Sequence, residues 1–306
     1  MIYTLTLNPA LDYVMDAEDI KFAATNRSSA ESISFGGKGI NVSVVLSRLG
    51  VPTTALGFAA GFTGAELQKA IEKEGINADF TELTEGMTRI NVKLLSGGEI
   101  TEINSSGPTI KENDLSRLYE KFATLSSGDT LVLAGSVPKG VNSGIYSEIM
   151  SFLLDKGIRF VVDTTGKTLL ETLKYKPFLI KPNRDELEEL FDCTISTDEQ
   201  IIECAKKLKN MGAENVLVSL GAEGAILLSA DGLVFKSPSH KISPKNTVGA
   251  GDSMVAGFLV GIDKGYEYAL HLGIAAGSAT ASSDTLGTKC EILKLMDEWV
   301  DKFENS

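Results

Sequence analysis

The chain has 306 residues, of which 43% are hydrophobic and only 7% aromatic, and it contains 30 glycines. This length and composition predict one large α/β domain rather than a fibrous or disordered protein. The 29 basic and 41 acidic residues give a formal charge of −12, which argues against nucleic acid or an anionic membrane as a partner. We therefore expect a few local cations to bind any anionic substrate.

The chain shows no sign of secretion, zinc binding or membrane insertion. Its three cysteines are widely spaced and it has only two histidines, which favours neither a disulfide framework nor a zinc site. No basic residue precedes Lys21, so we do not predict a signal peptide. The longest apolar stretch, near 254–262, is too short to span a bilayer. We expect a soluble, cytoplasmic protein.

Apolar strands alternate with helical patterns along most of the chain. The strands are expected at 2–7, 54–58, 130–134, 159–163, 178–180, 215–219 and 225–228. The helices are expected at 38–49, 64–73, 143–155, 185–191 and 198–211, with another opening near 254. This alternation predicts a mainly parallel sheet covered by helices on both faces.

Two regions interrupt the alternation. Segments 89–95 and 99–103, separated by Ser96-Gly97-Gly98, predict a hairpin, and segment 12–35 is polar and weakly alternating. We expect both to form a small antiparallel sheet that covers the carboxyl ends of the parallel strands as a lid. The simplest organisation is one domain over 1–306, with a lid from about 12–35 and 88–106. An exposed lid edge suggests a homodimer formed through the lid.

Segment 246–254 reads Asn-Thr-Val-Gly-Ala-Gly-Asp-Ser-Met and precedes an apolar run. It predicts a tight turn that opens a buried helix, with backbone N–H groups and the helix dipole available to an anion. Asp252 would lie beside that anion. A carboxylate next to a phosphoryl group is explained if it takes a proton from an attacking hydroxyl. The alternative is an ordinary acidic residue favoured by the helix dipole.

A second glycine-rich segment, 36–41, also opens a helix. Glycines such as Gly37 let the backbone approach a polyhydroxy ligand closely, Asn41 can donate and accept hydrogen bonds, and Lys38 can hold a phosphate. Taken alone, the segment is more typical of a helix start with a solvated lysine.

A polar segment beginning at Lys181 follows a buried strand and opens another helix. Asn183 and Glu186 lie three residues apart, so both can face the strand ends and hold a hydrated Mg²⁺. Taken alone, the same pair is more typical of a structural capping box.

Other segments are weaker candidates. The glycines of segment 219–224, at the end of a buried strand, allow a nucleotide to lie against the backbone, although a plain tight turn explains them equally. Asp12 can hold two sugar hydroxyls and Arg89 can bind a phosphate, although either could be a surface charge. Gly166-Lys167-Thr168 lacks the first glycine of a Walker A loop, and no Rossmann fingerprint or nucleophile elbow occurs.

Together these segments resemble the ribokinase-like carbohydrate kinases, also called the carbohydrate kinase B family. The resemblance covers nearly the whole chain in order, through segments 6–12, 36–41, 135–140, 181–183, 219–224 and 247–252. It implies a three-layer αβα sandwich with a mainly parallel sheet and a small β lid. It also implies Mg²⁺-assisted phosphoryl transfer from ATP to a sugar hydroxyl.

The resemblance implies a role for each matching residue. Asp252 would be the general base, and the backbone of Gly249, Ala250 and Gly251 would form the anion hole. The implied substrate-binding residues are Asp12, Arg27, Gly37, Lys38, Asn41, Arg89, Ser136 and Lys139. The implied ATP-binding residues are Lys181, Asn183, Ser219, Gly221, Ala222, Glu223, Gly224 and Gly251. Asn183 and Glu186 would hold Mg²⁺, through water.

Within the family, the start of the chain and segment 88–93 are similar to kinases of phosphorylated ketohexoses. The implied reaction phosphorylates the 6-hydroxyl of fructose 1-phosphate, giving fructose 1,6-bisphosphate. The alternatives are a kinase acting on the 1-hydroxyl of tagatose 6-phosphate, and a catalytically silent sensor of sugar phosphates. Asn246 replaces an Asp that many family members carry, so we assign no monovalent cation.

Overall fold

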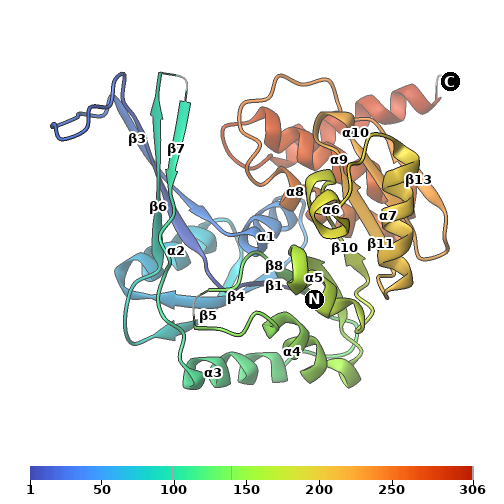
Figure 1. Ribbon diagram of the computed structural model, residues 1–306, viewed down its shortest axis with the longest axis horizontal. Helices are drawn as coiled ribbons and strands as arrows, with labels where there is room; N and C mark the ends of the chain where they lie inside the picture. The colour runs from blue at the N-terminus through green and yellow to red at the C-terminus, as the bar shows by residue number, and fades with distance from the viewer. Residues whose placement is uncertain (98, 139, 305–306) are drawn as a thin grey trace.

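The computed structural model describes residues 1–97, 99–138 and 140–304, and its main feature is a nine-stranded sheet (Figure 1). In spatial order its strands are β13 (Val234–Ser237), β12 (Ala225–Leu228), β11 (Asn215–Ser219), β10 (Leu179–Ile180), β9 (Arg159–Asp163), β8 (Thr130–Ala134), β1 (Ile2–Thr6), β4 (Thr53–Ala60) and β5 (Asn77–Leu83). The strands from β11 to β5 pair in parallel, whereas β12 and β13 pair antiparallel. The mainly parallel sheet is therefore confirmed.

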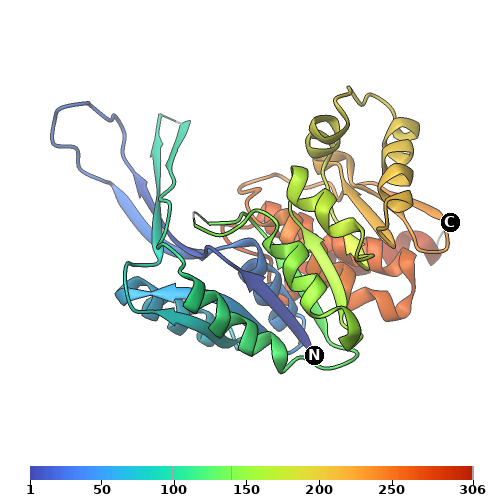
Figure 2. The same cartoon turned by 60° about the horizontal axis from the view of Figure 1, so that its bottom comes forward.

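Helices cover both faces of this sheet, because its strands carry apolar side chains on both faces. In β8, Leu131 and Leu133 belong to one core cluster and Val132 to another, as strand alternation requires. One face carries α3 (Glu112–Ala123), α4 (Ile145–Phe152), α5 (Gly166–Leu173), α6 (Arg184–Phe191) and α7 (Asp198–Asn210). The other carries α1 (Lys38–Arg48), α2 (Gly61–Lys73), α8 (Ala250–Gly261), α9 (Tyr266–Ser282) and α10 (Lys289–Glu304) (Figure 2). The αβα sandwich is confirmed.

A second sheet projects from the sandwich as the expected lid (Figures 1 and 2). Its order is β3 (Ala30–Gly36), β2 (Ala10–Asp16), β6 (Arg89–Ser96) and β7 (Glu99–Ile103). The expectation of a purely antiparallel lid is wrong, because β2 and β6 pair in parallel. Two antiparallel hairpins, β2–β3 and β6–β7, meet along that central pair, and local alternation does not predict how distant hairpins pair.

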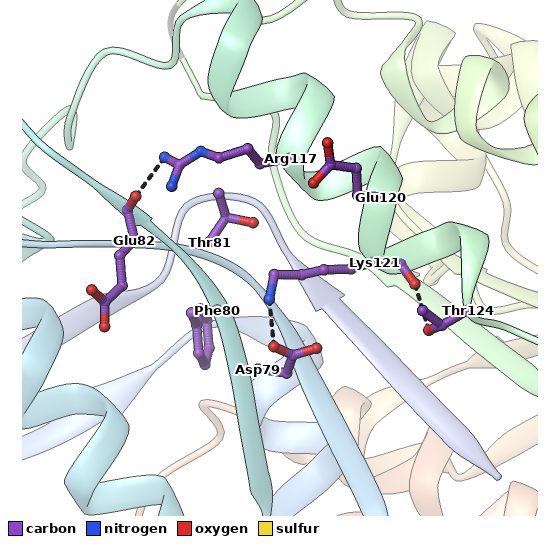
Figure 3. Close-up of a pocket in the computed structure, with 8 residues that line it drawn as sticks. All are labelled: Asp79, Phe80, Thr81, Glu82, Arg117, Glu120, Lys121 and Thr124. Carbon is purple, nitrogen blue, oxygen red and sulfur yellow. Dashed lines mark hydrogen bonds and ion pairs between the residues drawn. The ribbon is translucent and has the colours of Figure 1, made fainter.

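Helix α3 protects the outer edge of the main sheet at β5. Arg117 donates to the carbonyl oxygen of Glu82 at 2.5 Å and Lys121 pairs with Asp79, so the side chains of α3 cover polar groups of the edge strand (Figure 3). Charged side chains at a sheet edge discourage pairing with another chain. This part of the surface is thus explained by protection of the edge strand.

Several elements were not predicted from the sequence, namely β5, α3, α5, β13, α9 and α10. For helix α9 the reason is its burial, since all its residues from Ala269 to Thr280 are buried and the segment lacks an amphipathic stripe. No helix among the described residues is both long enough and apolar enough to cross a membrane.

Gly57 in β4 provides a test of the sheet packing. It has a φ of 152°, and a Cβ there would lie 2.1 Å from the carbonyl oxygen of Thr6 in β1. We expect Gly57→Ala to lower the free energy of unfolding by about 3 kcal/mol or more, measured by urea denaturation. Gly232→Ala is the control, because Gly232 has a φ of 86° but open space around it. The Gly232→Ala substitution should lower the free energy of unfolding by only about 1–2 kcal/mol. Equal losses in the two variants would contradict the steric explanation.

Candidate active site

A cavity of about 1330 Å³ lies at the carboxyl ends of the parallel strands. Its walls come from segments far apart in the chain, including the starts of α1, α6 and α8 and the base of the lid. The predicted site residues that line it are Gly37, Lys38, Asn41, Arg89, Ser136, Lys181, Asn183, Glu186, Ser219, Gly221, Ala222, Gly224, Gly249, Ala250, Gly251 and Asp252. Ligands bind at this edge of open α/β sheets. The fold therefore brings most of the predicted residues together.

The turn before α8 presents the helix N-terminus to the cavity. Gly249 caps the helix with a φ of 80°, and a Cβ there would lie 2.6 Å from Leu286 Cδ2, so only glycine fits. The N–H of Ala250 donates to the Thr247 carbonyl at 3.2 Å, while those of Gly249 and Gly251 have no partner among the described residues. With the helix dipole, these two N–H groups form a site for an anion.

Asp252 lies in the first turn of α8 and is only 5% exposed. Asn41 Nδ2, from α1, donates to its Oδ2 at 2.8 Å and fixes the side chain. Burial, followed by the negative charge of Asp163, raises the pKa of Asp252 to about 6. A carboxylate with a raised pKa, oriented and adjacent to an anion site, is suited to accept a proton near neutral pH.

Asp163, at the end of β9, joins two lysines in the cavity wall. Its Oδ1 lies 3.3 Å from Lys38 Nζ and 3.5 Å from Lys181 Nζ, and its side chain is only 1% exposed. Its Oδ2 is buried and, among the residues that the structure describes, has no hydrogen-bond partner. Sequence reasoning missed Asp163, although an acid that ends a buried parallel strand points to the ligand-binding edge of a sheet.

The two lysines bring positive charge to the anion site. A Cβ at Gly251 would lie 3.0 Å from Lys181 Nζ, so this ammonium group lies against the first turn of α8. Burial alone would lower the pKa of Lys38, but the charges of Asp163 and Asp252 raise it above its ordinary value. Lys38 therefore stays charged beside Asp252. Lys38 therefore lies at the same end of the cavity as the start of α8.

The glycine-rich segment before α1 lets the helix start close to β1. A Cβ at Gly37 would lie 2.6 Å from Thr6 Cγ2, and one at Gly39 would lie 2.7 Å from the Leu5 carbonyl oxygen. The first turn is fixed by the N–H of Ile40, which donates to Thr6 Oγ1 at 3.1 Å. This close packing places Lys38 and Asn41 in the cavity wall.

The lid contributes Arg89 to the cavity wall. Arg89 Nε donates to the Asn8 carbonyl at 3.2 Å, and burial lowers the pKa of the guanidinium from its ordinary value without making it neutral at physiological pH. Asp12 lies on the lid next to Gly36 rather than on the cavity wall. Arg27 is exposed in the loop between β2 and β3, away from the wall. Lys139 lies outside the described residues.

The start of α6 forms the opposite wall. Asn183 Oδ1 accepts from the Glu186 N–H at 2.7 Å, and Glu186 Oε2 accepts from the Asn183 N–H at 2.9 Å. The capping box considered from the sequence is thus present, and both residues also line the cavity. Glu223 does not line the cavity, and its exposed carboxylate pairs with Arg184 at 2.8 Å.

A model of the pfkB family of carbohydrate kinases matches residues 5–292. The chain belongs to this family. This pfkB kinase is 44% identical over 301 residues to the 1-phosphofructokinase of Bacillus subtilis, covering 97% of this chain and 98% of that relative. It is 37% identical over 290 residues to the D-tagatose-1-phosphate kinase of Bacillus licheniformis, covering 94% of each. The crystal structure of Escherichia coli phosphofructokinase-2 in complex with fructose-6-phosphate has a TM-score of 0.89 and 30% identity, covering 97% of this chain and 98% of that one.

The pfkB resemblance implies Mg²⁺ together with ATP, and the residues present fit a hydrated ion. Glu186 offers a carboxylate at the cavity wall, and the buried Oδ2 of Asp163 lacks a hydrogen-bond partner in the described part of the chain. Mg²⁺ keeps several waters and uses one or two carboxylates plus substrate phosphates. No three His, Cys, Asp or Glu side chains in the described ranges gather closely enough to hold an ion by themselves.

One end of the cavity of this pfkB kinase was not predicted from the sequence. It is formed by the segment after β13 and by the inner face of α9. Ile242, Pro244 and Ile274 give this end an apolar surface, and Ser239 and Ser278 add hydroxyl groups. The segment after β13 carries no motif that predicts a binding site, because its role depends on its packing beside α9.

Proposed function

We propose that this pfkB kinase transfers the γ-phosphoryl group of ATP to the 6-hydroxyl of fructose 1-phosphate, giving fructose 1,6-bisphosphate. The observation that carries the proposal is Asp252, buried, bound by Asn41 and adjacent to the N–H groups at the start of α8. The cavity is large enough for a nucleotide and a sugar phosphate side by side. An ATP-using sugar kinase belongs in the cytoplasm, as expected from the sequence.

Asp252 is the general base in the proposed mechanism. Its carboxylate takes the proton of the 6-hydroxyl as the new oxygen–phosphorus bond forms and the bond to the ADP oxygen breaks. The N–H groups of Gly249 and Gly251 stabilise the charge on the transferring group, and Lys38 and Lys181 add positive charge. Most of the rate comes from positioning and electrostatics.

The acceptor sugar lies between the lid and the start of α1. The sugar already carries a phosphate group. Arg89 can bind this phosphate through two parallel hydrogen bonds, with Ser136 as a neutral donor. Asn41 orients the hydroxyls from the cavity wall, Asp12 would reach them from the lid, where its carboxylate lies beside Gly36, and the backbone at Gly37 allows the close approach of the ring. Closure of the lid would exclude water from the reacting groups.

ATP occupies the other half of the cavity. We place its phosphates at the start of α8, beside Lys181, and its nucleoside along segment 219–224 and the apolar end beside α9, all of which line the cavity. Mg²⁺, when bound, neutralises charge on the phosphate oxygens, and Glu186 with Asn183 would hold its water ligands.

The choice of substrate rests on the relatives. The two kinases at 44% and 37% identity are named for ketohexose 1-phosphates, which favours an acceptor that carries its phosphate on C1. The test is steady-state kinetics with fructose 1-phosphate, tagatose 1-phosphate, tagatose 6-phosphate and fructose 6-phosphate, with ADP release as the readout. The proposal predicts the highest kcat/KM for fructose 1-phosphate. A preference for either 6-phosphate would contradict it.

A silent sensor of sugar phosphates is the non-enzymatic alternative from the sequence. Binding alone has no use for a buried carboxylate beside an anion site, because like charges repel. Tight binding of fructose 1-phosphate in calorimetry without ADP release would support the sensor.

A dimer through the lid also stays a prediction, and the exposed side chains of Ile33, Ile100 and Ile103 on the lid are compatible with it.

The raised pKa of Asp252 predicts the acid side of the pH profile. A base works only when deprotonated, so kcat/KM should fall tenfold per pH unit once the pH drops below about 6. With an ordinary aspartate as the base, the fall in kcat/KM would begin about two pH units lower. Rates between pH 5 and 8, at saturating Mg²⁺ and ATP, check this. Full activity at pH 5 would exclude Asp252 as a base with a raised pKa.

A further inference from the structure

One face of the lid near its base is polar, and the strand register explains why. Asp12 in β2 pairs directly with Asn91 in β6, so these side chains share a face of the sheet. Arg89 and Lys93, two residues before and after Asn91, lie on the same face. Because Arg89 lines the cavity, this face is the one turned towards the active site at the base of the lid.

Asp12 is held by both of its carboxylate oxygens. Asn91 Nδ2 donates to Oδ1 at 2.9 Å, and Lys93 Nζ lies 3.3 Å from Oδ2. The Asp12 side chain is only 12% exposed, and Lys93 is also mostly buried. A Cβ at Gly36 would lie 3.0 Å from Asp12 Oδ2, so this carboxylate also touches the glycine-rich segment that leads to Lys38. Asp12 therefore has one fixed orientation.

The side-chain amide of Asn91 uses its N–H group to bind Asp12, and this orientation determines where its oxygen lies. Asn91 Oδ1 is buried and has no hydrogen-bond partner within the described ranges. Turning the amide over would place this oxygen against the Asp12 carboxylate and remove the bond. An unpaired buried acceptor costs stability, so its retention calls for an explanation in function.

We propose that Asn91 and Lys93 are positioning residues, which hold the Asp12 carboxylate in the orientation that accepts the hydroxyls of the acceptor sugar. This inference rests on the proposed function. Asp12 would otherwise have to lose rotamer freedom when the sugar binds, and that entropy cost would weaken the affinity. A preorganised carboxylate keeps its remaining lone pairs for the sugar.

The test is the kinetics of Asn91→Leu and Lys93→Met, two variants that keep side-chain volume and remove the bond to Asp12. Each should raise the KM for fructose 1-phosphate by about 10–100-fold, with kcat and the KM for ATP within about twofold. Glu102→Gln is the matched control, because Glu102 lies 3.9 Å from Lys93 without touching Asp12. It should change no parameter more than about twofold.

A double-mutant cycle separates positioning from a general structural role. In an Asp12→Ala background, Asn91→Leu and Lys93→Met should have no further effect on the KM for the sugar phosphate. Effects that persist in that background, or that fall equally on the KM for ATP, would overturn the inference. If Asn91→Leu fails to fold, Lys93→Met in the same cycle decides. A wild-type enzyme without ADP release would instead contradict the proposed function.

Discussion

The Asp252→Asn variant is expected to keep its fold and its affinity for ATP, while kcat falls by about 10²–10⁴-fold, the contribution typical of a general base. Asparagine has the same shape but cannot accept the proton of the attacking hydroxyl. The KM for ATP should change by less than about twofold, because the N–H groups at the start of α8 remain. Steady-state kinetics with fructose 1-phosphate and ATP measure both quantities.

Asp198→Asn is the matched control for this variant. Asp198 is also an acid in the first turn of a helix, α7, but it pairs with Lys236 and does not line the cavity. Its substitution should leave kcat within about twofold of wild type. A kcat of Asp252→Asn within tenfold of wild type would show that Asp252 is merely a helix-start acid.

The kcat of the Lys38→Met variant is expected to fall by about 10²–10³-fold. This is the effect typical of removing one group that stabilises charge in the transition state. The side chain of Lys38 is 37% exposed, so a methionine of similar length should be tolerated by the fold. Of its two cationic partners among the described residues, the buried Asp163 would then keep Lys181. Kinetics at saturating concentrations of both substrates measure the loss.

Lys167→Met provides the comparison. Lys167 also follows a glycine at a helix start, but its side chain is 83% exposed and pairs with Glu171 in its own helix. We expect its kcat to stay within about twofold of wild type. If Lys38→Met instead changed only the KM for the sugar phosphate, Lys38 would bind the acceptor's phosphate, as first inferred from the sequence.

The site was most predictable where one short segment carries both the backbone conformation and the reactive group. Gly249 and Asp252 lie three residues apart, and the glycine requirement and the acid can both be read directly from that turn. The same holds for Gly37 and Lys38. The sandwich was predictable for a similar reason, because buried strands and amphipathic helices carry their own local patterns.

The rest of the site depends on contacts between distant residues. Asp163 is a single acid at the end of a strand, and its importance appears only when Lys38 and Lys181 meet it. Asn91 and Lys93 acquire a role only through the parallel pairing of β2 with β6. Such pairing is set by packing of the whole lid, for which a single sequence carries no local signal.

The most direct test of the central claim is ³¹P NMR of the wild-type enzyme mixed with fructose 1-phosphate, ATP and Mg²⁺. The proposed function predicts that ADP appears together with a second phosphomonoester resonance from C6, while the phosphate on C1 is retained. The Asp252→Asn sample, run in parallel, should show both signals far more slowly. No new phosphomonoester, or loss of the phosphate on C1, would contradict the proposed reaction.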